Sequence, residues 1–302
     1  MRSLLLLASF TFLIFYKSFT QSNPKPISEL IADGATLQQV SSKFTFTEGP
    51  TADQQGNVYF TDQPNDQIMK WSTDGTLSVF MKGAGRANGL YFDPEGRLLA
   101  CADEQNELWR IDENKEVTIL VDNYRGKKLN GPNDVWAHPN GGIYFTDPFY
   151  KRDYWERNEK EIEQENVYYL PPNQSELTVA ATDLVRPNGI VGTADGNLLY
   201  VADINDSKTY RYQIKADGNI GNRQLFVEMG SDGMTLDERG NLYLTGKEGV
   251  TVFNPQGEQI EQIPVPEGWT ANVCFGGKDR KKLFITAMKS LYILDMKVRG
   301  MK

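Results

Sequence analysis

The sequence predicts an all-β protein, a six-bladed β-propeller with four antiparallel strands in each blade. A short polar motif recurs six times, at intervals of 40 to 55 residues. Each copy is followed by a turn rich in Asp, Gly or Asn and then by an apolar strand. Periods of this length that contain only strand patterns are typical of propeller blades. The six copies are Glu48-Gly49-Pro50, Asn88-Gly89-Leu90, Asn133-Asp134-Val135, Asn188-Gly189-Ile190, Asp232-Gly233-Met234 and Asn272-Val273-Cys274.

The first unit contains the four strands that one blade needs. Alternating or continuous apolar runs predict strands at residues 49–53, 58–61, 67–71 and 76–81. The sequence Ser72-Thr73-Asp74-Gly75 separates the last two strands and is a strong hairpin indicator. The same turn chemistry returns in later units, so each unit is expected to fold as one blade.

The last unit lacks a clear fourth strand after the run from Leu291 to Asp295. The segment from Thr36 to Val40 precedes the first motif and is expected to fill that place. Pairing the two ends of the chain would close the ring and remove exposed strand edges. Residues 36–302 are therefore predicted to form one propeller domain.

The N-terminal residues are typical of a secretory signal peptide, which we assign to residues 1–21. Met1-Arg2-Ser3 is basic, an apolar run of about 13 residues extends to Tyr16, and a polar stretch follows. A retained membrane anchor is the alternative, but a membrane span needs about 20 apolar residues. Residues 22–35 are expected to be a linker or a loosely attached N-terminal arm. The mature protein is therefore expected to be secreted and free of the membrane.

Charge and cysteine content exclude several function classes. The chain carries 32 Lys and Arg against 40 Asp and Glu, a net charge of -8, and no basic stripe that would neutralise nucleic acid. Its two cysteines, Cys101 and Cys274, are too few for a zinc site of the thiolate type and are expected to be small buried side chains. Since propellers close on themselves, a monomer is expected.

Histidine content restricts the chemistry further. The single histidine, His138, lies in the turn His138-Pro139-Asn140-Gly141, which is expected on the surface. Neither a Ser-His-Asp triad nor a Cys-His pair can then be built, and the sequence has no Walker-type phosphate loop. If the protein is an enzyme, carboxylates or a metal ion must carry the reaction.

The motif residues provide such a set. Each one begins the innermost strand of its blade, so all six are expected around one mouth of the central channel. Two carboxylates and two amides give four oxygen donors with a charge of -2, which match one divalent cation; the donors are Glu48, Asp232, Asn133 and Asn188. Ca²⁺ accepts this donor set most readily, with Mg²⁺, Mn²⁺ or Zn²⁺ as alternatives.

The alternative interpretation of these motifs is structural. Asn-Gly and Asp-Gly are common turn dipeptides, and one copy alone is weak support for a metal ligand. The prediction depends on the whole set at equivalent positions of the repeat. The glycines that follow three motif residues are expected to permit close backbone approach at the narrow channel; they are Gly89, Gly189 and Gly233.

Several strings resemble the SMP-30/gluconolactonase/luciferin-regenerating family of six-bladed propellers, and the bacterial gluconolactonase branch in particular. The resemblance covers about residues 36–296. The strings are Thr47-Glu48-Gly49-Pro50, Leu129-Asn130-Gly131-Pro132-Asn133-Asp134-Val135, Thr146-Asp147-Pro148-Phe149-Tyr150, Arg186-Pro187-Asn188-Gly189, Ser231-Asp232-Gly233-Met234 and Asn272-Val273-Cys274-Phe275-Gly276-Gly277.

The resemblance implies roles for individual residues. Family members use residues that correspond to Glu48, Asn188 and Asp232 as metal ligands. Asn133 corresponds to an asparagine that lines the substrate pocket and in some members also binds the metal. Asp232 resembles the proposed general base of lactone hydrolysis, or the nucleophile of phosphotriesterase-like relatives. Gly131 stands where vertebrate members carry an arginine, so the sugar contacts are expected to differ.

The resulting hypothesis is a metal-dependent hydrolase that opens a sugar lactone, with Asp232 as its catalytic general base. Asn133 and Asn88 are expected to orient the substrate, and Arg186 either helps them or is an exposed charge. Two alternatives stay open: a related aryl-esterase or phosphotriesterase, and a non-catalytic extracellular binding propeller. The signal peptide and the resemblance to bacterial members together predict a periplasmic location.

The longest spacing between motifs contains an insertion at residues 148–166. Its sequence is aromatic and basic over residues 149–155 and rich in glutamate over residues 159–165. We expect a lid over the channel mouth, because loops that flank propeller sites often carry function. The alternative is a solvated loop packed on a neighbouring blade.

Overall fold

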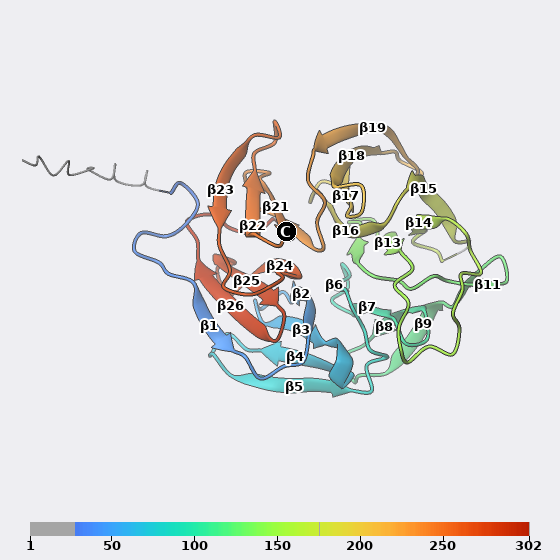
Figure 1. Cartoon of the computed structure of the whole chain (residues 1–302), viewed down its shortest axis with the longest axis horizontal. Coiled ribbons are helices and arrows are strands. Elements are labelled where there is room, and N and C mark those ends of the chain that lie inside the picture. The colour runs from blue at the N-terminus through green and yellow to red at the C-terminus, as the bar shows by residue number, and fades with distance from the viewer. Residues whose placement is uncertain (1–27, 175, 302) are drawn as a thin grey trace, which may run out of the picture.

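A computed structural model of the chain, describing residues 28–174 and 176–301, contains six four-stranded antiparallel sheets. The sheets stand radially around a central channel, with the first strand of each innermost (Figure 1). The predicted all-β, six-bladed propeller is confirmed. Within the described residues no helix is long or apolar enough to cross a membrane.

Blades one to five follow the chain in simple meander order, each with four consecutive strands. Blade one contains β2 (Thr47–Ala52), β3 (Val58–Asp62), β4 (Gln67–Trp71) and β5 (Leu77–Lys82). Blade two contains β6 (Leu90–Phe92), β7 (Leu98–Ala102), β8 (Glu107–Ile111) and β9 (Val117–Val121), and blade three contains β12 (Val135–Ala137), β13 (Ile143–Asp147), β14 (Glu165–Leu170) and β15 (Thr178–Leu184). Blade four contains β16 (Pro187–Gly192), β17 (Leu198–Asp203), β18 (Lys208–Ile214) and β19 (Ile220–Val227), and blade five contains β20 (Met234–Leu236), β21 (Leu242–Gly246), β22 (Gly249–Phe253) and β23 (Gln259–Ile263).

Blade six joins the two ends of the chain. It contains β24 (Asn272–Gly276), β25 (Lys282–Ala287) and β26 (Ser290–Asp295), and its outer strand is β1 (Gln38–Ser41). Gln38 lies opposite Ile293 in the antiparallel ladder between β1 and β26. The predicted closure of the ring by an N-terminal strand is confirmed, with the strand beginning at Gln38 instead of Thr36.

Residues 28–35 lead into β1 along the outside of blade six. Leu30 is buried, and Ile31 forms an isolated bridge with Met296. The signal peptide predicted at residues 1–21, and residues 22–27 of the predicted arm, lie outside the described residues.

The core lies between neighbouring blades. The second strands of the blades are buried along almost their whole length, because a blade is covered on both faces by its neighbours. Aromatic side chains make several of these contacts; Tyr243 of blade five meets Phe275 of blade six edge to face, with ring centroids 5.2 Å apart. Outer strands such as β9 are largely exposed.

Neighbouring blades approach each other closely at the polar motif. A Cβ on Gly89 would lie 2.6 Å from the carbonyl oxygen of Asn133, and the Gly89 N–H donates to that oxygen over 2.7 Å. A Cβ on Gly233 would lie 1.9 Å from Cγ of Asn272. Side chains at these positions would force the blades apart, so the expected role of the motif glycines is confirmed.

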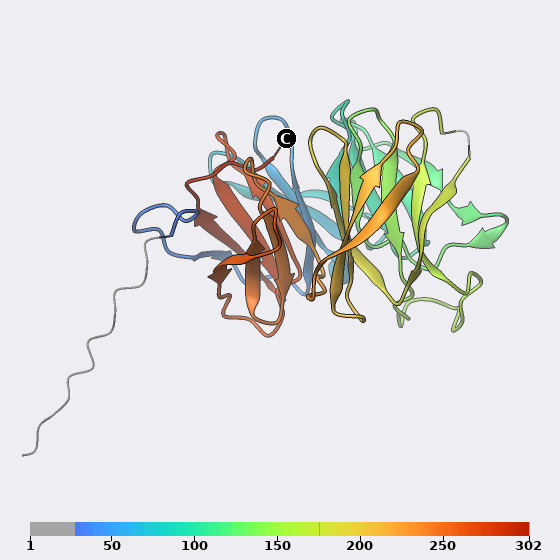
Figure 2. The same ribbon diagram turned by 90° about the horizontal axis from the view of Figure 1, so that it is seen from above.

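The face opposite the motif is covered in part by the C-terminal residues. Met301 N donates to the carbonyl of Leu236, which ends the inner strand of blade five, and Gly300 bridges to Asp237. The side view puts the C-terminal end on one face of the ring (Figure 2). A cavity of about 710 Å³ opens into the channel at that face, lined by inner-strand residues that include Tyr91 and Trp136 and by turn residues such as Glu95. The motif residues Glu48, Asn188 and Asp232 do not line this cavity.

Two small features lie outside the blade pattern. η1 (Gln63–Asn65) is a single 3-10 turn after β3, and β10 (Asn123–Tyr124) with β11 (Lys127–Lys128) forms a short hairpin between blades two and three. The sequence reading did not predict this hairpin.

Candidate active site and metal centre

The structure brings three of the four predicted metal ligands together at the motif mouth. Asn188 Nδ2 donates a hydrogen bond to Oδ1 of Asp232 over 2.8 Å. The charge of Asp232 raises the pKa of Glu48, which places these two carboxyl groups near each other. Residues from blades one, four and five therefore converge, although they are far apart in sequence.

Bulges in two strands orient the side chains of Glu48 and Asn188. The pairing of β2 with β3 skips one residue between Glu48 and Thr51, and the pairing of β16 with β17 does the same between Pro187 and Ile190. A one-residue bulge bends the strand and redirects the side chain at that position. At the first bulge Gly49 has a φ of +32°, a backbone conformation that favours glycine.

Aspartates at the ends of second strands fix the backbone just before the motif. Asp147 accepts hydrogen bonds from the N–H groups of Asn130 and Gly131, over 2.9 and 2.7 Å. Asp203 accepts from those of Val185 and Arg186, and Asp62 from those of Thr45 and Phe46. In blades one, three and four the motif residue is thus held by a carboxylate of its own blade.

Glu48 is a buried acid with little local compensation. Its side chain accepts one hydrogen bond, from the Gly49 N–H over 3.2 Å. Burial, followed by the charge of Asp232, raises the pKa of Glu48 well above its usual value. Two carboxylates held this way repel each other, and a divalent cation would relieve that repulsion.

Asp232 is held at both oxygens. Besides the bond from Asn188 to Oδ1, the indole Nε1 of Trp269 donates to Oδ2 over 2.6 Å. Burial raises the pKa of Asp232 to about 6, and the hydrogen bonds from Trp269 and Asn188 act against that rise. The group is therefore positioned, and close to a pKa at which it can exchange protons near neutrality.

Asn188 carries the feature that fits a metal ion best. Its Nδ2 donates to Asp232 and to the hydroxyl of Tyr150, but its Oδ1 is buried without a hydrogen-bond partner in the described part of the chain. A buried amide oxygen without a partner costs free energy unless something binds it. A hard cation between this oxygen and the two carboxylates would supply that partner.

The donor set is mixed, with amides alongside carboxylates. Among residues 28–174 and 176–301, no three His, Cys, Asp or Glu side chains form a group that could hold a metal on their own. The side chains of Asn133 and Asn88 are buried at the same mouth and make no hydrogen bonds within that part of the chain. Both amides are therefore available to a cation or a substrate.

A third carboxyl lies below the mouth. Asp134 follows Asn133, where most other motifs have glycine, and accepts from the N–H groups of Val135 and Ile190. Burial raises its pKa to about 7. Its bond to Ile190 ties blade three to blade four, so its role here is to join blades.

Arg186 lies beside the mouth and contacts two side chains. The sequence predicted that it would contact the substrate or be an exposed charge. Its Nε is 3.3 Å from a carboxylate oxygen of Glu165, and its guanidinium carbon lies 4.8 Å from the ring centroid of Tyr150. Tyr150 in turn contacts Asn188 through its hydroxyl over 2.9 Å. The structure therefore links Arg186 to the site through Tyr150.

Sequence reasoning missed three residues of this site. Tyr150 and Arg152 belong to the insertion, whose aromatic and basic composition was the available indication, and Trp269 lies in the connection before the sixth motif. Because these connections differ from blade to blade, no repeat position marks their residues. The insertion lies between Asn188 and blade two, and Trp155 within it is buried.

The remaining candidates lie away from the mouth. His138 makes a contact of 3.0 Å with the carbonyl of Gly196, in the turns at the opposite end of the inner strands. Cys101 and Cys274 are buried and free, as expected for small core side chains.

Comparison with known proteins decides the family. The model described as "SMP-30/Gluconolactonase/LRE-like region" matches residues 46–289. The chain belongs to this family. The matched residues span every motif copy and therefore the whole candidate site.

Relatives within the SMP-30/gluconolactonase/LRE-like family include named lactone hydrolases. A gluconolactonase from Zymomonas mobilis subsp. mobilis is 29% identical, over 91% of this chain and 85% of the relative. The lactonase drp35 of Staphylococcus aureus is 24% identical, over 84% and 81%. The solved structure of a gluconolactonase from Xanthomonas campestris is 29% identical with a TM-score of 0.82, covering 88% of this chain and 90% of that one. At the family level, this chain is similar to enzymes that open lactones.

Proposed function

We propose that this protein is a metal-dependent hydrolase that opens a sugar lactone. The observation that carries the proposal is the buried cluster of Glu48, Asp232 and Asn188. It combines two carboxyl groups of raised pKa with an amide oxygen that has no partner in the described residues. Apolar core packing gives no reason for such a cluster, whereas one divalent cation would satisfy all three.

The ligands would be Glu48, Asn188 and Asp232, with Asn133 as the fourth donor. An all-oxygen donor set of charge -2 favours Ca²⁺, with Mg²⁺, Mn²⁺ and Zn²⁺ as alternatives. When bound, the cation supplies Lewis-acid polarisation of the lactone carbonyl and stabilises the charge that develops on its oxygen.

Asp232 acts as general base and takes a proton from the water that attacks the ring carbonyl. Its pKa of about 6 suits this role, because a base works best when its pKa lies near the working pH. Trp269 and Asn188 fix the orientation of the carboxylate. The side-chain amides of Asn88 and Asn133 orient the substrate hydroxyls.

The named relatives support a lactone as substrate, since two of them are gluconolactonases and one is a lactonase. We further propose that residues 1–21 direct export, that the mature protein works in the periplasm as a monomer, and that it binds neither nucleic acid nor membrane. These proposals rest on the basic and apolar N-terminus and on the net charge of -8.

The test is hydrolysis of D-glucono-1,5-lactone by the purified protein after chelation and after return of Ca²⁺, Mg²⁺, Mn²⁺ or Zn²⁺. We expect turnover above the spontaneous rate only with metal. Glu48→Gln and Asp232→Asn should lose both metal binding, followed by calorimetry, and activity. Asp217→Asn removes a fully exposed turn carboxylate and is the matched control.

Other outcomes point to the two alternatives. Metal binding with turnover of aryl esters or phosphotriesters, but of no lactone, would favour an esterase or phosphotriesterase. A protein that binds no metal and turns over none of these substrates would be a binding propeller, and the proposed function would be wrong.

A further inference from the structure

Asp103 departs from the role that its counterparts play in other blades. It stands directly after β7, at the position that corresponds to Asp62, Asp147 and Asp203 in blades one, three and four. Each of those three aspartates accepts hydrogen bonds from two backbone N–H groups. In blade two the corresponding N–H of Arg86 is bound by Asp66 over 2.8 Å instead. The carboxylate of Asp103 is therefore not needed to hold its own blade.

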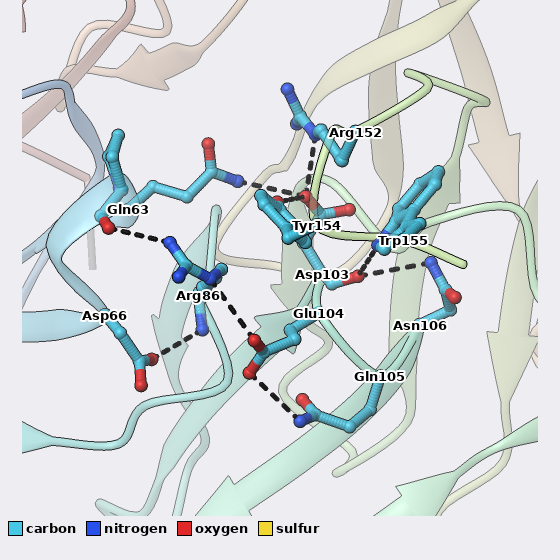
Figure 3. Close-up of polar contacts among 11 residues, drawn as sticks. Gln63, Asp66, Arg86, Asp103, Glu104, Gln105, Asn106, Arg152, Tyr154 and Trp155 are labelled. Atoms are coloured by element: carbon cyan, nitrogen blue, oxygen red, sulfur yellow. Dashed lines mark hydrogen bonds and ion pairs between the residues drawn. The ribbon is translucent and has the colours of Figure 1, made fainter. Parts of the chain in front are cut away.

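Asp103 instead binds the insertion after blade three's second strand. One of its oxygens accepts from Nε of Arg152 over 2.7 Å and from the hydroxyl of Tyr154, while Nε1 of Trp155 donates to its backbone carbonyl over 2.8 Å (Figure 3). Gln63 adds a weaker bond of 3.3 Å to the same carboxylate oxygen. Three side chains thus bind one buried carboxylate, a fourth binds the backbone carbonyl of the same residue, and Arg152 is held in place.

Arg152 is held by only one of its three nitrogens. Its Nε is bound to Asp103, whereas Nη1 and Nη2 have no partner in residues 28–174 and 176–301. The side chain is 25% exposed. Its guanidinium carbon lies 5.5 Å from the ring centroid of Tyr150, whose hydroxyl contacts Asn188 of the candidate metal centre. A guanidinium fork offers two parallel donors, the geometry that suits carboxylate, sulfonate or phosphate oxygens.

A second arginine lies beside the first. The guanidinium carbons of Arg152 and Arg186 lie 5.5 and 4.8 Å from the ring centroid of the same tyrosine, Tyr150. The hydroxyl of that tyrosine accepts a hydrogen bond from Asn188. Arg186 is also engaged only at Nε, by Glu165. Two forks with free Nη groups are therefore positioned around one ring at the edge of the site.

The arginines beside the mouth are only partly engaged by carboxylates. Asp103 pairs with Arg152 through Nε, and Glu165 is shared by Nε of Arg186 and Nζ of Lys160. Arg157 nearby donates to backbone carbonyls, and the charges of Asp147 and Glu161 act on it. The Nη groups of Arg152 and Arg186 are therefore the donors that remain available to an anionic group on a substrate.

We propose that Arg152 and Arg186 form an anion-binding subsite, and that the preferred substrate is an acidic sugar lactone carrying a carboxylate, sulfonate or phosphate away from its ring carbonyl. This inference deepens the proposed lactonase function and rests on it. Asp103 is the positioning residue, because it orients Arg152 without itself meeting the substrate. An arginine that only tied down the insertion would not need its Nη groups free.

The test compares a neutral and an acidic lactone on the metal-loaded protein. D-glucono-1,5-lactone is neutral, and D-glucaro-1,4-lactone carries a carboxylate at the far end. We expect kcat/KM at least tenfold higher for the acidic lactone. Arg152→Gln should raise KM for the acidic lactone about tenfold or more and lower the acidic-to-neutral ratio of kcat/KM by a similar factor. Arg152→Lys keeps the charge but not the fork, and should lie between the wild type and Arg152→Gln.

Two further variants separate recognition from folding. Asp103→Asn should raise KM for the acidic lactone while leaving kcat for the neutral one within threefold. Arg223→Gln removes an arginine that stacks on Tyr210 far from the mouth, 3.8 Å from its ring centroid, and should change neither lactone's kinetics. Equal losses on both lactones in Arg152→Gln and Arg152→Lys, or a preference for the neutral lactone, would overturn the proposal.

A binding measurement keeps the inference separate from catalysis. Calorimetry on the metal-loaded protein should show tighter binding of D-glucarate, which has two carboxylates, than of D-gluconate, which has one. Arg152→Gln should remove the difference. If no lactone is turned over but the difference persists, the proposed reaction is wrong and the anion subsite stands; equal affinities in the wild type would exclude the subsite.

Discussion

The indole Nε1 of Trp269 donates a hydrogen bond of 2.6 Å to Oδ2 of Asp232, across the junction between blades five and six. Asn188 donates to the other oxygen of the same carboxylate over 2.8 Å. Both bonds favour the ionised form of Asp232 and oppose the effect of burial on its pKa. The reactivity of this group is therefore set by residues from two neighbouring segments, and each can be changed separately.

Replacing Trp269 with Phe removes a donor but keeps an aromatic ring. The pKa of Asp232 should then rise above about 6, so the acidic limb of the pH–rate profile should move to higher pH. We expect kcat/KM to fall about 10- to 100-fold at pH 7, the range seen when partners of metal ligands are removed.

The matched control is Trp109→Phe, which removes an indole bond to the carboxylate of Glu107 on β8, away from the mouth. It should leave the pH profile unchanged. A Trp269→Phe enzyme with the wild-type profile would show that the indole does not tune Asp232.

The raised pKa values predict how stability depends on pH when metal is absent. Burial raises the pKa of Asp134 and Asp147 to about 7 and that of Asp232 to about 6, above the values of an unfolded chain. The folded state then binds more protons than the unfolded state between about pH 4 and 7, so stability rises as pH falls through this window. The Tm of the chelated protein should therefore increase from pH 8 to pH 5.5.

The stabilisation that a bound metal ion provides should depend on pH in the opposite direction, because protons compete with the metal for its carboxylate ligands. The rise in Tm on adding Ca²⁺ should be large at pH 8 and small at pH 5.5, as scanning calorimetry at several pH values would measure. Asp232→Asn should remove the metal effect at every pH. A Ca²⁺ effect on Tm that is independent of pH would contradict the assignment of carboxylate ligands.

Gly89→Ala tests the close approach of blades at the motif. The added Cβ would lie 2.6 Å from the backbone oxygen of Asn133 and 2.7 Å from Cα of Asp134, and backbone atoms cannot rotate away. We expect a loss of about 1–3 kcal/mol in the free energy of unfolding, measured by urea titration. Gly221→Ala on β19 meets only the Lys215 side chain, at 3.4 Å, and should cost much less. Equal stability of the two variants would show that the blades can separate at the motif without cost.

Asp203→Asn tests the aspartates that hold the motif backbone. The substitution replaces one acceptor by an NH₂ group, which would face the N–H of Val185 or Arg186. A buried donor facing another donor should cost about 1–3 kcal/mol of stability. Asp103→Asn, whose carboxylate holds no backbone N–H, should cost less stability and instead change substrate binding. Thermal unfolding of the two variants side by side distinguishes these roles.

The repeat explains why so much of the fold could be predicted from sequence. The spacing of the motifs fixed six blades, and strand edges predicted in the first unit lie within two residues of those in the structure, because turn residues such as Gly75 mark them. The incomplete last unit pointed to closure by β1. The hairpin of β10 and β11 was missed, since its two-residue strands are too short to carry a pattern.

Some residues of the candidate site could be predicted from the sequence and others could not. Its motif residues, such as Glu48, stand at equivalent positions, so their convergence follows from the architecture. Tyr150, Arg152 and Trp269 reach the mouth from connections whose paths depend on tertiary contacts, and periodicity carries no information about them. The altered role of Asp103 was equally hidden, because its residue type and position match those of its counterparts.

The pairing of β1 with β26 also bears on how the chain is made. Residues 38–41 emerge early in translation, whereas their partners at residues 290–295 emerge almost last. At roughly 5–20 residues per second, the first strand waits more than about ten seconds for its neighbour. Until then the chain exposes an unpaired strand edge at each end of an open arc. The ring becomes a single cooperative unit only when its final strand arrives.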